Sequence, residues 1–261
     1  MAVRGVRASG DEMKLASSKI FAGLAGSYEK ALDYATLFQD RRWKCWVARR
    51  LKAGRGDLVL DVGSGTLVLE EFLATKKCRF IALDLAPEMI RVAVEKGVPN
   101  VDLVLNGDAE FLPFPDRSFD SVVSCYVPKY VDVEKFAEEV ARVAKPGAAV
   151  VLYDFAKPRG PLAPFLEIYI RCGLRLVGVA LGLVRREEAF TFDRLPQIIE
   201  NTTWDLDMVE AMKSNGFVEV ESDRLTGGVV FACSGRRGES LGARRGAPGW
   251  SGRTGEGPRR S

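Results

Sequence analysis

Short apolar strands alternate with helical segments between residues 57 and 153, and this alternation constrains the fold more than any other feature of the chain. Parallel strands must be joined by long crossovers, which are usually helices. The pattern therefore predicts an α/β fold with a doubly wound, mostly parallel sheet. Strands are expected at residues 57–61, 79–84, 101–105, 119–125 and 148–153, and helices at 67–75, 87–96 and 133–144.

The flanking segments add helices at the N-terminal side and a hairpin at the other. Helical patterns at about residues 16–38 and 40–51 precede the first strand. Strands at 217–222 and 228–232 are expected to close the sheet as an antiparallel pair, which makes seven strands in all. A helix at 205–215 leads into this pair.

A helical insertion is expected before the last two strands. It combines an apolar, helix-like stretch at 161–186 with an irregular stretch at 190–203, and we interpret residues 159–203 as a helical lid. The apolar stretch is punctuated by arginines, which suits either a channel for a greasy substrate with a surface that meets a bilayer, or a buried crossover helix. Its longest uncharged run, residues 176–184, is far shorter than the ~20 residues that a spanning helix needs.

The two ends of the chain differ from the middle in composition. Residues 235–261 hold seven Arg against two Glu, a balance of +5, so the net charge of +3 leaves −2 for residues 1–234. Such a Gly- and Arg-rich segment buries too little apolar surface to fold, and we predict a disordered basic tail. Residues 1–13 are also predicted to be disordered, which places the folded domain at residues 14–234. A slightly acidic body argues against a nucleic-acid partner.

The residue types present limit the chemistry. The chain contains no histidine, which excludes catalytic triads, Cys-His pairs and histidine-based zinc sites. Its five cysteines are widely spaced without a C-x-x-C pair, so we expect neither a disulfide framework nor a metal site, and a reducing, cytoplasmic location. No secretory leader is visible in the first residues. Catalysis must use carboxylates, Tyr, Lys, Cys or the reactivity of a cofactor.

A glycine-rich turn after the first strand predicts the kind of cofactor. It reads Asp61-Val62-Gly63-Ser64-Gly65-Thr66-Leu67, and Val68 stands where a dinucleotide fingerprint requires glycine. The carboxylate of Asp61 would repel a pyrophosphate. S-adenosylmethionine instead has an ammonium, a sulfonium and one carboxylate, which suits Asp61 together with the backbone of Gly63, Ser64 and Gly65.

Two more acids follow the next two strands. Asp84 lies 21 residues after Gly63, the spacing of a ribose-hydroxyl acceptor, and Leu85 stands beside it. Asp108 and Ala109 follow the third strand and suit an adenine amino group and ring. Because the carboxyl ends of parallel strands share one edge of the sheet, these acids are expected to gather there, although each of them alone would also suit a helix cap.

These motifs resemble the class I S-adenosylmethionine-dependent methyltransferases, and in particular the C-methyltransferases of ubiquinone and menaquinone biosynthesis. The resemblance covers about residues 20–234 and is carried by segments 21–28, 39–43, 60–66, 107–116, 142–147, 154–158 and 225–230. It implies a Rossmann-like methyltransferase fold, S-adenosyl-L-methionine as cofactor, and C-methylation of a polyprenyl quinone precursor, a hydrophobic quinol. Contact with a membrane surface is a further expectation.

Three departures from the family pattern keep alternatives open. Leu67 replaces the third glycine of the loop, Pro128-Lys129-Tyr130 replaces the usual Arg-Asn after the fourth strand, and Asp154 replaces a Glu. Lys129 and Tyr130 favour another small acceptor, such as a phenol, a lipid or a thiol. Leu67 is the one feature that favours a non-catalytic scaffold.

The methyl transfer itself needs little from the protein beyond alignment and one modest base, because the sulfonium is already activated. The candidates for that base are Asp154, Tyr126 and Tyr28, with Lys129 as a stabiliser of phenolate charge. Each of the three could instead be a capping or packing residue.

Overall fold

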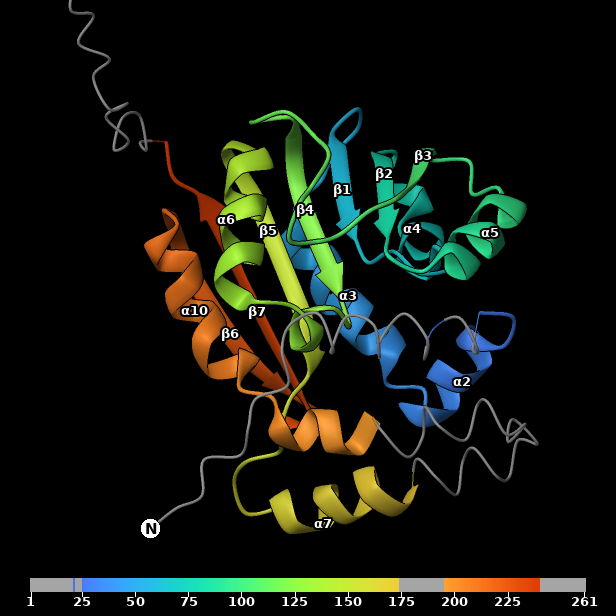
Figure 1. The fold of residues 1–261 in the computed structure, drawn as a ribbon, viewed down its shortest axis with the longest axis vertical. Helices are drawn as coiled ribbons and strands as arrows, with labels where there is room; N and C mark the ends of the chain where they lie inside the picture. Colours follow the sequence, from blue (N-terminus) through green and yellow to red (C-terminus); the bar gives the residue numbers. More distant parts are fainter. Residues whose placement is uncertain (1–20, 22–24, 174–194, 240–261) are drawn as a thin grey trace, which may run out of the picture.

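The computed structural model describes residues 21, 25–173 and 195–239, and it contains one seven-stranded sheet (Figure 1). The order of the strands across the sheet is β3-β2-β1-β4-β5-β7-β6. Their bounds are β1 Leu58–Val62, β2 Arg79–Asp84, β3 Val101–Asn106, β4 Phe119–Cys125, β5 Ala144–Phe155, β6 Phe217–Leu225 and β7 Val230–Arg237.

The predicted doubly wound sheet is confirmed. The first five strands pair in parallel, whereas β7 runs antiparallel to both β5 and β6. The direction in which successive strands are added reverses between β1 and β4, and open sheets of this kind bind ligands at such a point.

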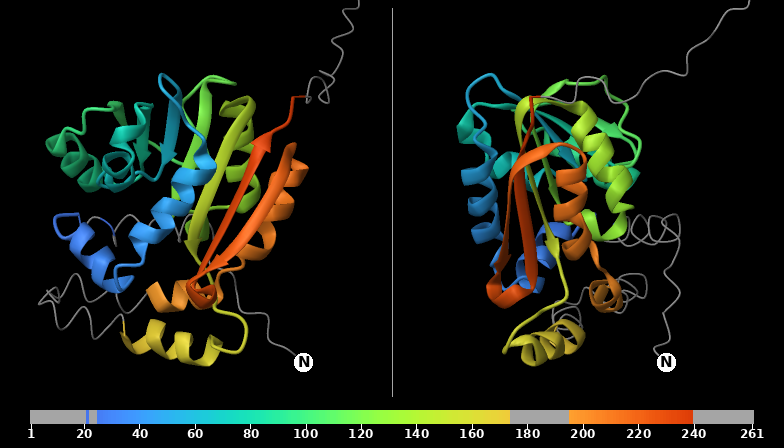
Figure 2. Two further views of the ribbon diagram at one scale, coloured as in Figure 1. Left: turned by 180° about the vertical axis from the view of Figure 1, so that it is seen from behind. Right: turned by 90° about the vertical axis from the view of Figure 1, so that its left-hand side faces the viewer.

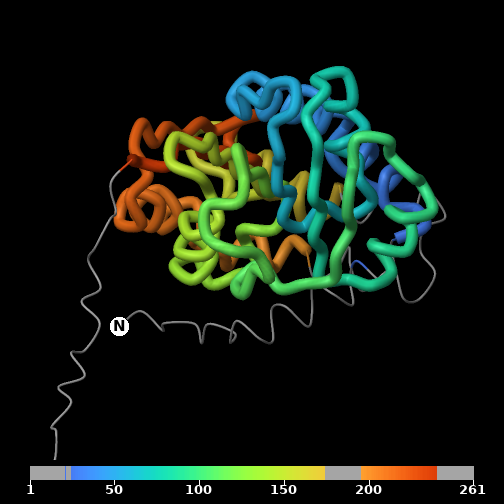
Figure 3. The backbone as a smooth tube through the Cα atoms, turned by 90° about the horizontal axis from the view of Figure 1, so that it is seen from above, coloured from blue at the N-terminus to red at the C-terminus, as the bar shows by residue number. Residues whose placement is uncertain are grey.

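Helices cover both faces of the sheet, as the two views of Figure 2 and the view from above in Figure 3 show. Helices α3 (Asp40–Leu51), α4 (Val68–Phe72) and α5 (Pro87–Lys96) pack on one face; α6 (Val133–Val143) and α10 (Trp204–Ser214) pack on the other. The end of the sheet where β1, β2 and β4 finish faces α2 (Tyr28–Ala35) and α7 (Ala163–Ile168) in Figure 1. These two helices therefore border the edge at which the sequence places its acids.

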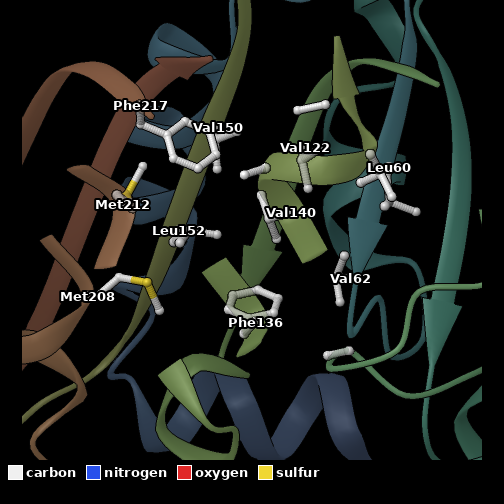
Figure 4. Packing of buried hydrophobic residues seen from close by; sticks show 14 of the residues in the cluster. Leu60, Val62, Val122, Phe136, Val140, Val150, Leu152, Met208, Met212 and Phe217 are labelled. Atoms are coloured by element: carbon white, nitrogen blue, oxygen red, sulfur yellow. The ribbon is translucent and has the colours of Figure 1, made fainter. Parts of the chain in front are cut away.

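The core follows from alternation along the strands. Leu60 and Val62 of β1 point to the face covered by α6, whereas Val59, the residue before Leu60, points to the face covered by α3. Figure 4 shows Leu60 and Val62 in one layer with Phe136 of α6 and Met208 of α10. Two helices and the strands thus exclude water from this face.

Local capping signals end the helices where the sequence predicts. Helix α5 begins with Pro87 in its first turn and ends at Gly97, which takes the left-handed conformation that favours glycine. Helix α6 begins after Asp132, whose side chain accepts hydrogen bonds from the backbone of Glu134 and Lys135.

Several predicted boundaries differ from the structure. The strand expected at residues 148–153 begins earlier, because α6 ends at Val143 and Ala144, the first residue of β5, already pairs with Phe119 of β4. The expected domain end at residue 234 is too early, since β7 pairs with β6 as far as Arg237. Residues 195–201 are helical, although the sequence suggests an irregular stretch there.

The expected long apolar segment is only partly described. It contains α7 and a π-helical turn, η3 (Tyr169–Gly173), whereas residues 174–194 lie outside the described residues. The predicted disordered segment 1–13 and residues 240–261 of the predicted tail also lie outside them. In the part of the chain that the structure does describe, no helix has the length and apolar character required to cross a membrane.

Candidate active site

A pocket opens at the carboxyl ends of β1, β2 and β4. Three glycine-rich or acidic turns and two tyrosines of the prediction meet there. The lining residues are Phe21, Tyr28, Gly63, Gly65, Leu83, Asp84, Leu85, Met89, Gly107, Asp108, Ala109, Cys125, Tyr126, Val127, Tyr130 and Val131.

Two glycines of the wall have no room for a side chain. A Cβ at Gly63 would lie 2.0 Å from Cγ2 of Val127, and the residue has a φ of +78°. A Cβ at Gly107 would lie 2.7 Å from Cδ1 of Leu83. The packing of Val127 and Leu83 therefore requires glycine at these two positions of the pocket wall.

Asp84 joins two sides of the pocket. Its Oδ2 accepts a hydrogen bond of 2.8 Å from the backbone N–H of Gly65, and its Oδ1 accepts one of 2.8 Å from Ala86. Burial raises the pKa of this carboxyl, and the backbone hydrogen bonds counteract the rise. Each oxygen keeps a lone pair for a further donor, which suits a diol.

Asp108 and Ala109 form the turn after β3. Oδ1 of Asp108 accepts a hydrogen bond of 2.9 Å from the backbone of Glu110, so the side chain stabilises its own turn. Leu85 and Met89 line the same pocket with apolar atoms. A polar edge beside apolar walls suits a heteroaromatic ring.

Asp61 and Ser64 lie beneath the loop. Neither is part of the pocket wall, and both are buried. Among the described residues, Oδ1 of Asp61 and Oγ of Ser64 have no hydrogen-bond partner. Buried polar atoms without partners are rare in folded proteins and call for an explanation.

These features fit S-adenosylmethionine. Three glycines line the pocket and leave it free of side chains at their positions, Asp84 can accept from vicinal hydroxyls, and unpaired oxygens beneath the loop suit a cation. When bound, this cofactor supplies a methyl group activated by a sulfonium.

Tyr126 is held in a strained backbone conformation with φ of +66°. Its hydroxyl donates a hydrogen bond of 2.5 Å to Oδ1 of Asp40, which also accepts 3.1 Å from the Tyr153 hydroxyl and pairs with Lys44. Burial raises the pKa of Tyr126 well above its usual value. Tyr126 therefore lines the pocket, but its ring packs against Tyr153 and Phe155 and its hydroxyl already donates to Asp40.

The structure does not bring Lys129 and Asp154 to the pocket wall. They form a fully buried ion pair with Nζ of Lys129 2.6 Å from Oδ1 of Asp154, and the lysine also donates to the backbone oxygen of Tyr126. Burial lowers the pKa of Lys129 and raises that of Asp154, whereas their contact counteracts both shifts. The pair lies behind the turn that carries Tyr126 and Tyr130.

Tyr28 and Tyr130 stand together at the mouth of the pocket. The ring of Phe21 contacts both edge-on, with centroid distances of 6.0 and 5.8 Å. Burial raises the pKa of each phenol, so both stay protonated at neutral pH. Within the described part of the chain, the Tyr130 hydroxyl is buried with no hydrogen-bond partner. Its ring lies 4.1 Å from Nζ of Lys129.

Leu67 does not narrow the pocket. It takes the left-handed conformation with φ of +63°, as the glycine of the usual pattern would, but its side chain is buried among Ala82, Ala93 and Val98. The residue is absent from the pocket wall. The scaffold hypothesis thus loses its one structural argument.

Sequence reasoning found half of the residues that line the pocket. Eight predicted residues line the pocket: Gly63, Gly65, Asp84, Leu85, Asp108, Ala109, Tyr28 and Tyr126. Four others are absent from the pocket wall: Asp61, Ser64, Lys129 and Asp154. Tyr130, Asp40 and Glu70 were not foreseen as site residues. Tyr130 had a signal, since it follows the carboxyl end of β4, but Asp40 and Glu70 lie on helices with no motif around them.

Comparison with known proteins agrees with this geometry. The model of a methyltransferase domain matches residues 60–152. The methyltransferase chain in a complex with the Haloferax volcanii Trm112 methyltransferase activator has a TM-score of 0.59 at 20% identity, over 84% of this chain and 97% of that one. A SAM-dependent methyltransferase from Aquifex aeolicus has a TM-score of 0.52 at 22% identity, over 74% and 89%. Fold and site together define an S-adenosylmethionine-dependent methyltransferase.

Similarity in sequence identifies the family. The demethylmenaquinone methyltransferase of Tropheryma whipplei is 30% identical over 84% of this chain and 91% of its own length. The enzyme of the same name from Streptomyces avermitilis is 31% identical over 86% and 95%. The chain belongs to the demethylmenaquinone methyltransferase family.

Proposed function

We propose that the protein transfers the methyl group of S-adenosylmethionine to a ring carbon of a polyprenyl hydroquinone. The observation that carries the proposal is the similarity to demethylmenaquinone methyltransferases over 84–86% of the chain. The pocket supports it, because aromatic side chains of Tyr28, Tyr126 and Tyr130 adjoin the cofactor loop and suit a flat aromatic acceptor.

The assignments within the pocket follow from its chemistry. Asp84 accepts from the ribose hydroxyls, Leu85, Asp108 and Ala109 border the adenine, and the backbone of Gly63, Ser64 and Gly65 surrounds the methionine end. Asp61 faces the cationic groups of that end from beneath the loop. The acceptor then enters past Tyr28 and Tyr130.

The acceptor carbon becomes nucleophilic when its neighbouring phenol loses a proton. Tyr28 and Tyr126 are poor bases, because burial raises their pKa and Tyr126 already donates to Asp40. We assign Tyr130 as the hydrogen-bond donor to the acceptor oxygen, since a donor to the phenolate lowers the pKa of the acceptor itself. Lys129 and Asp154 position this tyrosine from behind.

The decisive experiment combines binding and product analysis. Calorimetric titration of S-adenosylmethionine is expected to give micromolar affinity that Asp84→Ala weakens and that Asp102→Asn, on the neighbouring strand and outside the pocket, leaves unchanged. A labelled methyl group should then appear on a ring carbon of a short-chain demethylated naphthohydroquinone. Methyl transfer to oxygen, or none despite tight cofactor binding, would refute the proposed acceptor.

Tyr130 offers a test of the acceptor chemistry. Tyr130→Phe removes the hydroxyl and keeps the ring, so we expect turnover to fall by about tenfold or more without a change in cofactor affinity. Tyr130 also favours a second class of acceptor, because a tyrosine in place of the residue usual in the family suits other phenols. A panel of simple phenols and thiols in the same assay separates the two.

A membrane surface is the proposed source of the acceptor. Tyr34, Leu37 and Phe38 at the end of α2 are exposed, and so are Leu162, Phe165 and Ile168 of α7. The Tyr169 hydroxyl donates to the backbone oxygen of Ala35 at 2.9 Å, which joins the two helices. This apolar surface, formed by the ends of α2 and α7, suits contact with the interface of a bilayer in which a polyprenyl chain resides.

A further inference from the structure

Two buried carboxyl groups flank the glycine-rich loop behind the pocket wall. Asp61 belongs to β1 and Glu70 to α4, and the two side chains are 1% and 0% exposed. Buried carboxylates normally receive several hydrogen bonds or pair with a cation. Among the residues that the structure describes, neither oxygen of Glu70 nor Oδ1 of Asp61 has such a partner.

The two carboxyls adjoin each other. The side chains of Asp61 and Glu70 lie close enough to interact directly, and both are buried with oxygens that have no other hydrogen-bond partner among the described residues. Two carboxyl groups can hydrogen-bond only when one of them carries a proton. Burial and then the charge of Glu70 raise the pKa of Asp61, and burial raises the pKa of Glu70 to about 7.

The charged groups around the pair leave it without a cation of its own. Lys44 of α3 and Lys96 of α5 act on it at a distance, but Lys44 pairs with Asp40 and Lys96 pairs with Glu29 and Glu71. The remaining groups that face the pair add negative charge or none at all. They are Asp84 of β2 and the Cys125 thiol at the end of β4.

The position of the pair connects it to the ligand. Asp61 precedes Gly63 by two residues, and Gly63 lines the pocket. Oγ of Ser64, in the same loop, is also buried without a partner in the described structure. Three oxygen-bearing side chains that lack donors thus adjoin the place where the cationic end of the cofactor belongs.

We propose that Asp61 and Glu70 share one proton in the ligand-free protein and release it to solvent when the ammonium end of the cofactor binds beside the loop. The ammonium supplies the missing positive charge, both carboxyls become ionised, and one proton leaves for each cofactor bound. The inference rests on the cofactor part of the proposed function and not on the acceptor. It makes cofactor affinity rise with pH, by up to tenfold per pH unit.

The proton count is measured by calorimetry. S-adenosylhomocysteine, which has the ammonium but no transferable methyl group, is titrated into the full chain at pH 7.5 in phosphate and in Tris. The difference in heat between the two buffers, divided by the difference in their ionisation enthalpies, gives the number of protons exchanged. We expect a release of about one proton from the wild-type protein, accompanied by weaker binding at pH 6.

Two neighbouring variants separate the pair from its surroundings. The Glu70→Gln protein should release almost no protons when the ligand binds, because the amide donates a hydrogen bond to Asp61 and leaves Asp61 ionised in the free protein. Glu71→Gln is the matched control, since Glu71 is the next residue, exposed, and paired with Lys96. The Glu71→Gln protein should release the same number of protons as the wild-type protein. Circular dichroism checks that both variants fold.

Each outcome decides between the hypotheses. Binding by the wild-type protein without proton release overturns the inference and leaves the cofactor assignment in place. Equal release from the wild-type and Glu70→Gln proteins overturns the role of Glu70. No binding by folded wild-type protein overturns the cofactor part of the proposed function, and the inference with it.

Discussion

Gly63 and Leu67 both take a left-handed backbone conformation within one loop, but the structure uses the two positions differently. At Gly63 the missing side chain leaves the space that Val127 occupies. At Leu67 a side chain is present and packs away from the pocket into an apolar cluster. The same backbone requirement is therefore met by a glycine where space is short and by a buried leucine where it is not.

Replacing Gly63 tests its place in the pocket wall. Gly63→Ala should weaken S-adenosylmethionine binding by at least tenfold, because its Cβ would overlap Val127 and displace the loop. Gly97→Ala is the control, since Gly97 also has a positive φ but nothing within 4 Å of an added Cβ. The control should lose about 1 kcal/mol of stability and keep its affinity. Equal affinities for both variants would show that glycine at position 63 does not matter for binding.

Replacing Leu67 tests whether it obstructs the site. Leu67→Gly relieves backbone strain but removes a buried side chain, so the free energy of unfolding should fall by about 2 kcal/mol. Cofactor affinity should change by less than about threefold, because Leu67 is absent from the pocket wall. A large gain in affinity would instead mean that Leu67 restricts the ligand. Chemical denaturation and calorimetry measure the two effects.

Glu70 should make stability depend on pH. Its pKa is raised from 4.5 to about 7, so the folded state binds more protons than the unfolded state between these values. Stability therefore declines as the pH rises through this window. Denaturation at pH 5 and pH 8 should show Glu70→Gln gaining on the wild-type protein by up to about 3 kcal/mol at the higher pH. A constant difference between the two proteins would contradict the shifted pKa.

At the scale of elements, the turn after β4 is held by β5. The short helix η2 (Pro128–Tyr130) follows the strained Tyr126, and Asp154 of β5 accepts hydrogen bonds from both the backbone and the side chain of Lys129. The backbone N–H of Tyr126 donates to Tyr153 at 2.9 Å. Strained conformations persist only when neighbours determine them in this way.

Breaking the buried pair should therefore disturb this turn. Asp154→Asn leaves Lys129 charged and unpaired in the interior, at a cost of about 3–5 kcal/mol in unfolding free energy. The double change Lys129→Met with Asp154→Leu should recover most of that stability, and turnover should remain low because Tyr130 is no longer positioned. Full activity of the double variant would refute the positioning role. Thermal denaturation and the methyl-transfer assay give the two readouts.

At the scale of the whole molecule, the pocket and the exposed apolar surface lie at the same end. The pocket lies at the carboxyl ends of the parallel strands, and α2 and α7 border that edge in Figure 1. The apolar surface at the ends of these helices is formed by residues that are far apart in the chain, such as Phe38 and Phe165, which are separated by 127 positions. The membrane contact proposed above would place this end of the molecule against the bilayer.

Flotation with liposomes tests this arrangement. The protein should float with vesicles that contain anionic lipid, and Phe38→Ser with Phe165→Ser should reduce the bound fraction severalfold, since each buried aromatic contributes apolar area. Val94→Ser with Val218→Ser changes exposed apolar residues on α5 and β6, away from this end, and should have no effect. No flotation of the wild-type protein would remove the membrane as the source of the acceptor.

The sequence alone determined the layers of the fold and the class of cofactor. Strand periodicity, the turn from Asp61 to Leu67 and the acids at 84 and 108 are local signals, and each one depends on neighbours within a few residues. Since ligands bind at the carboxyl ends of the strands in open α/β sheets, these local signals predicted a single binding site at that edge. Helix and strand bounds such as those of β2, α5 and β4 agree with the structure for the same reason.

Only the tertiary structure decided which side chains face the ligand. Lys129 and Asp154 were expected in the pocket, but burial makes each the partner of the other, and no local pattern predicts a contact between residues 25 positions apart. The same holds for Asp40, which binds Tyr126 from 86 positions away, and for Glu70 beside Asp61. Their environment is set by packing between elements, because desolvation and pairing depend on which surfaces meet and not on spacing along the chain.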